Sequence, residues 1–400
     1  MKQIISIDPL SRYNPLEKAG WSLELLKNAS VLVVGAGALG NEVLKNLALL
    51  SVGKIFIADF DIVKHVNLSK SVLFRESDCD GTRHKATVAA ERLQEINPAV
   101  RIQPILGDIS IDVGLGLIRR MDIVIGCLDN LLARLAINRL CFKMNKPWVD
   151  GAIENLAGQL NVFSPEGECY ECRLTDSEWA HLHRRIGCPD IAIQNISQGR
   201  IPTSPLSASV IGALQVIEAL KLIGSPKMRK YSRAGSPIYF DGMDASTLSM
   251  EAAPRKDECE SHFAYGTPIE ASLSAQDTVG DVLAWISAYF GQEDASIILD
   301  HEVITAVGSE MQDRVYDGLY IPKPHLSGRL KSMFQFDSAD TVRIMPGATL
   351  TVLDKRFPHP EMTLAQLGVP PLHILQVSIA GDPVFVELTG DERFWRMETL

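Results

Sequence analysis

The chain has 400 residues, enough for two or three domains with buried cores, and its 46% hydrophobic and 22% charged residues are typical of globular proteins. A formal net charge of −10, with no long cluster of lysine and arginine, argues against a nucleic-acid-binding protein. No apolar run approaches the roughly 20 residues that cross a bilayer, and the first residues lack the apolar core of a secretion signal, so no membrane partner is expected.

The first strong pattern lies in residues 31–61, VLVVGAGALGNEVLKNLALLSVGKIFIADFD. A short apolar run at 31–34 predicts a buried parallel strand. Apolar residues at helical spacing follow, and a second apolar strand at 55–58 ends in Asp59. Between the first strand and the helix stands a glycine motif, Gly35-x-Gly37-x-x-Gly40.

This order of strand, glycine turn, helix, strand and acid is typical of a nucleotide site. The glycines allow a tight turn, a close approach of the backbone to phosphate, and close packing of helix on strand. Asp59 can accept a hydrogen bond from a ribose hydroxyl. A glycine turn without a ligand is the alternative, and the stretch by itself does not distinguish NAD from ATP.

Strands continue to alternate with helices as far as residue 150. We expect helices at 9–28, 81–97 and 131–144, and strands at 100–106, at 122–126 and from 148. This spacing predicts an α/β fold with a doubly wound, Rossmann-like, mostly parallel sheet.

The character of the sequence changes after residue 150. Residues 158–165 alternate like an antiparallel strand, 175–203 have no clear core pattern, 205–223 read as a buried helix, and 237–242 read as a strand. We place the end of the first domain at residue 262.

Residues 263–400 read as a separate, small α+β domain of ordinary size. One amphipathic helix is expected at 278–290, whereas residues 306–340 show no clear pattern. Short strands are expected at 297–299, 342–344, 349–353, 375–378 and 384–388.

Polar residues after the second strand suit a triphosphate better than a pyrophosphate. Basic side chains there can neutralise charge that develops on a leaving group. A single surface lysine is more often merely solvated, so only the set is informative. It consists of Asp59, Asp61, Asn67, Lys70 and Lys85.

Asp129 and Asn130 follow the strand at 122–126, with Arg134 and Asn138 close behind. Open α/β sheets bind ligands at the carboxyl ends of their strands. Asp129 could hold Mg²⁺ beside phosphates. Its alternative role is that of a helix N-cap.

Seven cysteines, an odd number in a long chain, favour a reducing compartment and thus a cytoplasmic protein. Four residues form two pairs at ligand spacing, Cys169-x-x-Cys172 and Cys259-x-x-His262. Two such pairs from separate segments predict a closed, structural Cys₃His zinc site. The zinc would cross-link residues 169–172 to residues 259–262, and we call these two segments the arm of the first domain.

Cys188 lies in a polar segment after His183, Arg184 and Arg185. Neighbouring positive charge lowers the pKa of a thiol and favours a nucleophile. Most cysteines are buried core residues instead, and that alternative stays open here.

Together these stretches resemble the ThiF/MoeB/HesA adenylyltransferase family. That family activates ubiquitin and ubiquitin-like proteins and includes bacterial enzymes that adenylate sulfur carriers. The matching stretches cover nearly all of residues 30–262. They are VLVVGAGALGNEVLKNLAL, IFIADFDIVKHVNLSKSVLF, GTRHKATVAAERLQEINP, GCLDNLLARLAINRLC, WVDGAIENLAGQLNVFSPEGECYEC and SVIGALQVIEALKLI.

The resemblance implies ATP and Mg²⁺ and assigns roles to individual residues. Gly35, Gly37 and Gly40 look like the phosphate turn, and Asp59 looks like the ribose ligand. The other nucleotide-site positions are Asp61, Asn67, Lys70 in the place of the usual arginine, Lys85 as the phosphate-binding lysine, Asp129 as the Mg²⁺ carboxylate and its neighbour Asn130.

The C-terminal domain resembles a ubiquitin-fold domain that recruits a conjugating enzyme, through SLSAQDTVGDVLAWI and MTLAQLGVPPLHILQVSIAGDPVFVEL. The resemblance therefore implies activation of a ubiquitin-like protein, thioester formation on Cys188 and transfer to a conjugating enzyme, as in bacterial ubiquitin-like conjugation. A single adenylation domain suggests a homodimer, and a heterodimer with a paralogous chain is the alternative. The alternatives are an adenylyltransferase for a sulfur carrier or peptide, without a thioester, and a non-catalytic nucleotide-binding scaffold.

Overall fold

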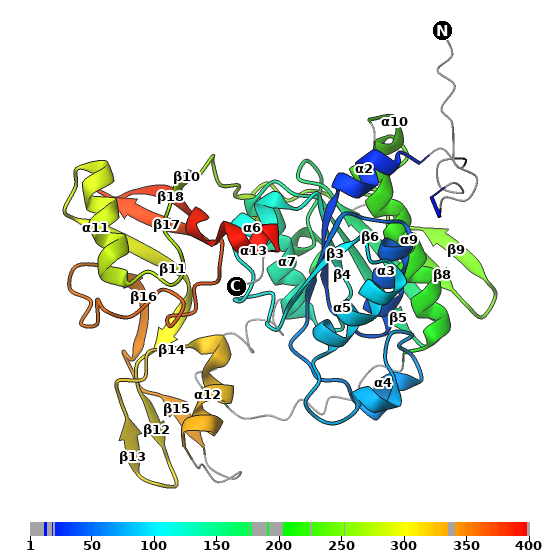
Figure 1. The fold of residues 1–400 in the computed structure, drawn as a ribbon. Coiled ribbons are helices and arrows are strands. Elements are labelled where there is room, and N and C mark those ends of the chain that lie inside the picture. The colour runs from blue at the N-terminus through cyan, green and yellow to red at the C-terminus, as the bar shows by residue number, and fades with distance from the viewer. Residues whose placement is uncertain are drawn as a thin grey trace. The chain divides into compact units, whose positions relative to one another are not determined.

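The structure is a computed structural model. It describes residues 12–13, 18, 21–175, 177, 190–191, 203–224, 226–251, 253–334 and 341–397. The chain forms two compact units (Figure 1). The first unit contains residues 1–109, 120–173 and 201–262, and the second contains residues 110–119, 174–200 and 263–400.

The sheet of the first unit has eight strands in the order β3-β2-β1-β4-β5-β6-β8-β9. The pairs from β3 to β5 are parallel and those from β5 to β9 are antiparallel, which confirms the predicted Rossmann-like sheet. The bounds are β1 Ser30–Val34, β2 Lys54–Ala58, β3 Arg101–Ile105, β4 Ile123–Gly126, β5 Trp148–Glu154, β6 Ala157–Phe163, β8 Ile238–Asp241 and β9 Ser246–Ser249.

Helices cover this sheet, and both faces of its central strands are buried. Every residue of β1 is buried. Alternate residues such as Val31 and Val33 share one core with side chains of α3, α5 and α9. The remaining residues of the strand lie on the opposite face because side chains alternate. The helices are α2 Leu23–Asn28, α3 Ala38–Leu49, α4 His65–Leu68, α5 Lys85–Ile96, α7 Leu131–Lys143, α9 Pro205–Ile223 and α10 Pro226–Arg229.

From the sequence we expected no apolar run long enough to cross a membrane, and helix α9 does not meet that expectation. By length and composition alone it qualifies as a candidate span. Half of that span is buried against the protein, and the helix packs on α3, β5 and β6. A core helix passes the same test, and this packing accounts for the apolar composition of α9.

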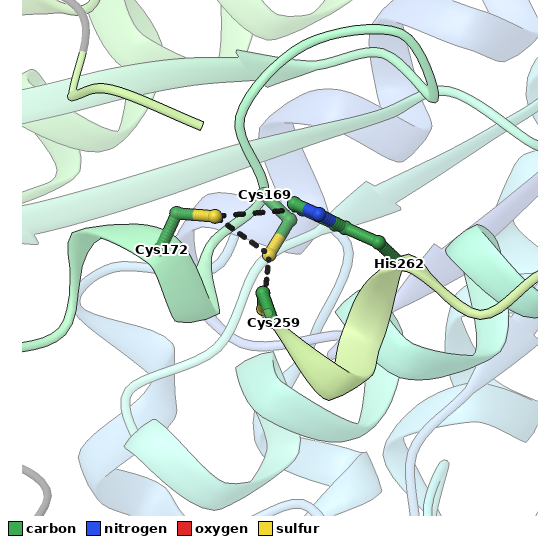
Figure 2. A group of neighbouring side chains, drawn as sticks. All are labelled: Cys169, Cys172, Cys259 and His262. Carbon is green, nitrogen blue, oxygen red and sulfur yellow. Dashed lines mark hydrogen bonds between the residues drawn. The ribbon is translucent and has the colours of Figure 1, made fainter. Parts of the chain in front are cut away.

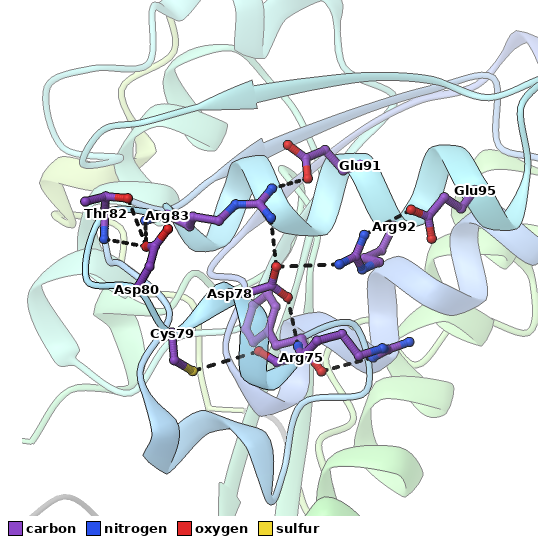
Figure 3. Close-up of polar contacts among 10 residues, drawn as sticks. Arg75, Asp78, Cys79, Asp80, Thr82, Arg83, Glu91, Arg92 and Glu95 are labelled. Carbon is purple, nitrogen blue, oxygen red and sulfur yellow. Dashed lines mark hydrogen bonds and ion pairs between the residues drawn. The ribbon is translucent and has the colours of Figure 1, made fainter.

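A buried carboxylate organises the connection between β2 and α5. Asp78 is fully buried, and its carboxylate accepts hydrogen bonds from the Arg75 backbone at 2.8 Å and from the Arg83 guanidinium at 2.8 Å (Figure 3). Arg92 of α5 approaches the same carboxylate at 3.5 Å. These contacts fasten the connection to α5, which begins at Lys85.

The second unit contains a six-stranded and a four-stranded sheet, together with α11 (Val279–Phe290) and α12 (Leu326–Met333). The larger sheet has the order β10-β18-β17-β11-β14, and β16 also pairs with β11. Its strands are β10 Ile269–Ala271, β11 Ala295–Ile304, β14 Ile321–Pro322, β16 Thr349–Leu353, β17 Ile374–Ile379 and β18 Asp382–Leu388. Helix α11 contacts β11, and this C-terminal α+β architecture was predicted.

Residues 306–340, which gave no sequence pattern, contribute β12, β13, β14 and α12. The smaller sheet has the order β13-β12-β15-β7, with β7 Asp190–Ile191, β12 Val307–Ser309, β13 Arg314–Tyr316 and β15 Val342–Ile344. A separate small core lies beneath it, formed by Ile304, Val307, Ile321, Leu326, Leu330 and Val342. The described residues also form helices α6 Leu115–Arg120 and α13 Glu392–Arg396.

Candidate nucleotide and metal sites

The turn between β1 and α3 depends on two glycines. Gly35 has a φ of +95°, and a Cβ atom there would lie 2.5 Å from the carbonyl oxygen of Cys127. A Cβ atom on Gly40 would lie 1.9 Å from the carbonyl oxygen of Gly35. The backbone therefore packs against backbone at both positions, and side chains do not fit.

Gly37 is different, because a Cβ atom there would meet no atom within 4 Å. It is the N-cap of α3 and makes no side-chain cap. The first N–H groups of a helix have no partner within the helix, and they lie at the positive end of the helix dipole. Open space beside free N–H groups fits an anion such as a phosphate.

Asp59 is anchored at the end of β2 next to this turn. One carboxylate oxygen accepts the Ala36 N–H at 2.7 Å, and the other accepts the Asp61 N–H at 2.8 Å. Burial raises the pKa of the Asp59 carboxyl above its ordinary value, while nearby Lys85 and the two backbone donors oppose the rise. The carboxylate is thus held at the glycine turn.

Lys85 and Asp61 form an ion pair in the same part of the first unit. The ammonium lies 2.7 Å from the Asp61 carboxylate, and the Lys85 backbone N–H also donates to the Asp61 carbonyl at 2.8 Å. The Lys85 side chain is 11% exposed, whereas that of Asp61 is 42% exposed. A buried ammonium held by a partly exposed partner can turn toward an incoming phosphate.

The connection after β2 carries the other two predicted residues. Asn67 is buried, and its side-chain oxygen accepts the Lys64 N–H at 2.9 Å. The ammonium of Lys70 donates to the Thr203 hydroxyl at 2.7 Å. Thr203 stands two residues before α9, so Lys70 is held by a segment far away in the sequence.

Asp129 and Asn130 follow β4 and are both exposed. The N-cap of α7 is Asn130, whose side-chain oxygen accepts the Ala133 N–H at 2.8 Å. The capping role considered for Asp129 is therefore filled by its neighbour. The Asp129 carboxylate does not cap the helix, and it is exposed. A carboxylate is the ligand type that Mg²⁺ prefers.

Asn41 belongs to this site but was not singled out in the sequence. Its side chain is fully buried and donates to the carbonyl of Ala36 at 2.8 Å and to that of Gly37 at 3.0 Å. Its oxygen accepts the Leu73 N–H at 2.8 Å. It therefore ties the glycine turn to the connection after β2. A polar residue on the buried face of an apolar helix was the available signal.

The second site is the cysteine and histidine cluster of the arm (Figure 2). One ligand atom from each of four residues lies within 4.8 Å of every other, as expected for the predicted Cys₃His set, Cys169, Cys172, Cys259 and His262. Burial raises the pKa of the Cys169 thiol to about 12. Metal binding would have to displace this proton, because cysteine binds metal as the thiolate.

Buried polar contacts hold the two halves of the arm together around the cluster. Glu171 is buried and accepts hydrogen bonds from the Ser261 hydroxyl and from Arg139 of α7, the latter at 2.9 Å. The Nδ1 atom of His262 is buried without a hydrogen-bond partner in the described part of the chain. The Nε2 atom of His262 lies 3.4 Å from the Cys172 sulfur and therefore faces the cluster, so the donor set fits a tetrahedral zinc ion with Nε2 as the ligand atom.

Cys188, the predicted nucleophile, lies outside the described residues, and its role stays a prediction. The structure brings the glycine turn, Asp59, Asp61 and Lys85 together. It fixes Asn67 and Lys70 on the connection after β2.

The fold and this site define a class of α/β nucleotide-binding proteins with a cysteine and histidine cluster on an arm. The chain belongs to the ThiF family, which its residues 13–261 match. This finding confirms the family resemblance found in the sequence.

Two relatives illustrate the family. The chain is 31% identical over 257 residues to the adenylyltransferase and sulfurtransferase MOCS3 of Anopheles gambiae, with 63% of this chain and 54% of that protein covered. It is 33% identical over 247 residues to the sulfur carrier protein adenylyltransferase of Thermus thermophilus, with 59% and 84% covered. The chain thus spans about half the length of MOCS3.

Among solved structures, Escherichia coli MccB with MccA-N7isoASN aligns with a TM-score of 0.51 and 21% identity, covering 63% of this chain and 75% of that one. MccB with succinimide gives a TM-score of 0.52 at 21% identity, with 64% and 75% covered. At this level of identity the likeness shows the fold.

The two kinds of glycine predict different outcomes on substitution. Gly37→Ala should fold with only a small loss of melting temperature, because its Cβ meets open space and only the N-cap preference is lost. It should lose ATP affinity by about tenfold or more as the methyl group enters the phosphate position. Gly40→Ala should destabilise the fold, because its Cβ meets backbone. Thermal unfolding and calorimetric titration with ATP check both. Unchanged ATP affinity in Gly37→Ala would contradict the phosphate turn.

Proposed function

We propose that the first unit is an ATP-dependent adenylyltransferase that activates the C-terminal carboxylate of a small protein or peptide. The observation that carries this proposal is the Lys85–Asp61 pair, at 2.7 Å, beside an Asp59 carboxylate fastened to the glycine turn. A dinucleotide site needs no buried ammonium here, whereas transfer at a triphosphate does. The names of the MOCS3 and Thermus relatives, both adenylyltransferases, support the same reaction class.

In the proposed reaction a carboxylate oxygen of the substrate attacks the α-phosphorus of ATP. The bond from the α-phosphorus to the bridging oxygen of the β-phosphate breaks, which gives an acyl-adenylate and pyrophosphate. The protein supplies orientation and charge neutralisation rather than covalent chemistry. Asp59 orients the ribose, the turn before α3 binds phosphate, and Lys85 and Lys70 neutralise negative charge.

Two metals fit this scheme. Mg²⁺ would be held by Asp129, and it would neutralise charge on the phosphates. Zinc would be held by the four residues of the arm. Its role would be structural, since a Cys₃His set closes the tetrahedral site and leaves no open position for a substrate.

The substrate class follows most directly from the relatives. The Thermus relative is named as an adenylyltransferase of a sulfur carrier protein, so a carrier of this kind is the first substrate to test. We further propose that the enzyme works as a homodimer, as one adenylation domain per chain suggests.

A second candidate function adds a thioester step. Its support is the main part of the second unit, residues 263–400, an α+β domain that follows the zinc arm directly in the sequence, where the resemblance implies a domain that recruits a conjugating enzyme. In this scheme the thiolate of Cys188 attacks the carbonyl carbon of the adenylate and AMP leaves, with a ubiquitin-like protein as substrate.

Lys85 tests the adenylation step. Lys85→Ala should lower substrate-dependent ATP–pyrophosphate exchange by about 100-fold or more, because charge on the leaving group is no longer neutralised. The protein should stay folded, since the Asp61 partner is 42% exposed and can be solvated. Lys227→Ala, at an exposed lysine of α10, is the matched control. Exchange at the wild-type rate in Lys85→Ala would refute the assigned role.

Cys188 separates the two candidate functions. If the thioester forms, incubation with ATP and a ubiquitin-like substrate should give a thiol-sensitive covalent adduct in the wild type and none in Cys188→Ala. Exchange should persist in both proteins. Mass spectrometry of the intact chain is the measurement. Adduct formation by Cys188→Ala would show that Cys188 is not the nucleophile, and no adduct in either protein would favour the sulfur-carrier reaction.

The zinc site predicts about one zinc ion per chain by elemental analysis. Cys172→Ser should reduce that content and lower the melting temperature, because the metal cross-links segments about 90 residues apart. Cys79→Ser is the control, since that half-buried cysteine lies outside the cluster. A wild-type protein free of zinc after purification without chelators would contradict the site.

A further inference from the structure

The last residue of β4 and the loop after it, residues 126–130, are held by hydrogen bonds at several points. The Cys127 N–H donates to the Val34 carbonyl at 2.8 Å, which ties the loop to β1. At its far end Asn130 caps α7. Asp129, the proposed Mg²⁺ ligand, is exposed like its neighbour Asn130, on a backbone that these contacts hold in place.

Arg134, in the first turn of α7, donates hydrogen bonds to this loop and to the neighbouring strand. Its guanidinium donates to the Leu128 carbonyl at 2.5 Å, to the Gly151 carbonyl at 3.3 Å and to the Asp150 carboxylate at 2.9 Å. The Arg134 side chain is only 13% exposed. One planar group therefore joins the residue before Asp129 to the neighbouring strand β5.

Asp150, the carboxylate that pairs with Arg134, is itself held in place. It is 2% exposed, and its second oxygen is approached by the Asn161 amide at 3.5 Å. Asn161 in turn accepts a hydrogen bond from Arg173. Breaking a buried ion pair by removing one partner leaves an uncompensated charge, so Arg134 has little freedom to leave its position.

Gln215 of α9 holds the start of the loop from the other side. It is fully buried, its amide donates to the Gly126 carbonyl at 2.8 Å, and its oxygen lies 3.8 Å from the Cys127 sulfur. It packs so closely on β5 that a Cβ atom at Gly151 would lie 2.5 Å from its amide carbon. A polar side chain so placed in an apolar helix has a specific partner to satisfy.

We propose that Arg134 and Gln215 are positioning residues that hold the Asp129 carboxylate where it can bind the metal of a metal–ATP complex. The inference rests on the proposed function, because it takes Asp129 as the metal ligand. Outer residues that orient metal ligands typically set metal affinity. An arginine is required at position 134 because a lysine ammonium does not present a planar fork to three acceptors in different directions.

The test measures metal binding rather than turnover. Mn²⁺ replaces Mg²⁺ and is titrated into the full chain saturated with α,β-methylene-ATP, and free Mn²⁺ is followed by electron paramagnetic resonance. Arg134→Lys should weaken Mn²⁺ binding by about 10- to 100-fold. The affinity for the nucleotide without metal, measured by calorimetry, should stay within about twofold, since the glycine turn is untouched. Gln215→Met, which keeps the side-chain volume, should act in the same direction.

Two further variants separate positioning from simple stability. Arg229→Lys is the matched control. Arg229 also donates to a carbonyl, that of Leu222, but this contact lies at the C-terminal end of α9 and does not involve the loop that carries Asp129. Asp129→Asn should weaken Mn²⁺ binding on its own, and Arg134→Lys should then add little to it, as expected for residues that act through one another.

Two results would overturn the inference: Mn²⁺ binding in Arg134→Lys equal to that of Arg229→Lys, or fully additive losses in the double variant. The proposed function fails separately. A wild type that binds Mn²⁺ and the nucleotide but catalyses no exchange with any polypeptide tail would refute adenylation and leave the positioning role standing. A wild type that binds no nucleotide would refute both.

Discussion

The nucleotide site depends on backbone packed directly against backbone at the turn between β1 and α3. At Gly35 and Gly40 the contacts are too close for a side chain. This packing brings α3 close to the strands, and the first N–H groups of the helix have no partner within the helix itself. At Gly37 the protein leaves space that its own packing does not use. Tight packing behind the turn and open space in front of it are what a phosphate site requires.

Around that turn, buried polar side chains fasten loops that would otherwise move independently. Asn41 ties the glycine turn to the connection after β2, and Asp78 fastens the rest of that connection to α5. Gln215 and Arg134 do the same for the loop after β4. A buried polar group is costly unless it is hydrogen-bonded, so each of these residues favours one arrangement of its loop. Together they preorganise the candidate ligands before any nucleotide binds.

In the zinc arm, distant segments are also held together, here by a metal site as well as by hydrogen bonds. Two segments about 90 residues apart meet at four ligand atoms, and the buried Glu171 joins them a second time through Ser261 and Arg139. Burial raises the pKa of the Cys169 thiol, and a bound divalent ion would supply positive charge that stabilises the thiolate. The arm connects strands of the nucleotide-binding sheet with α7, so the metal would stabilise the unit that carries the site.

The sequence by itself determined the features that are encoded by residues close together in the chain. The alternation of apolar strands and helices, the spacing of the glycines and the two pairs of metal ligands each follow from a few neighbouring residues. The parallel sheet, the turn and the four-residue cluster are therefore present as expected. Helix α11 also begins after its Thr278 cap within a residue of the predicted start.

Only the tertiary structure decided contacts between distant parts of the chain. Lys70 meets Thr203, 133 residues away, and Arg134 of α7 meets Asp150 of β5, 16 residues away. Asn130 rather than Asp129 caps α7, because the backbone conformation at the strand end selects between two adjacent polar residues. Residues 306–340 gave no pattern because their strands are only two or three residues long and pair with partners elsewhere in the chain. Periodicity records which face of an element is buried, whereas the path of the chain determines what covers that face.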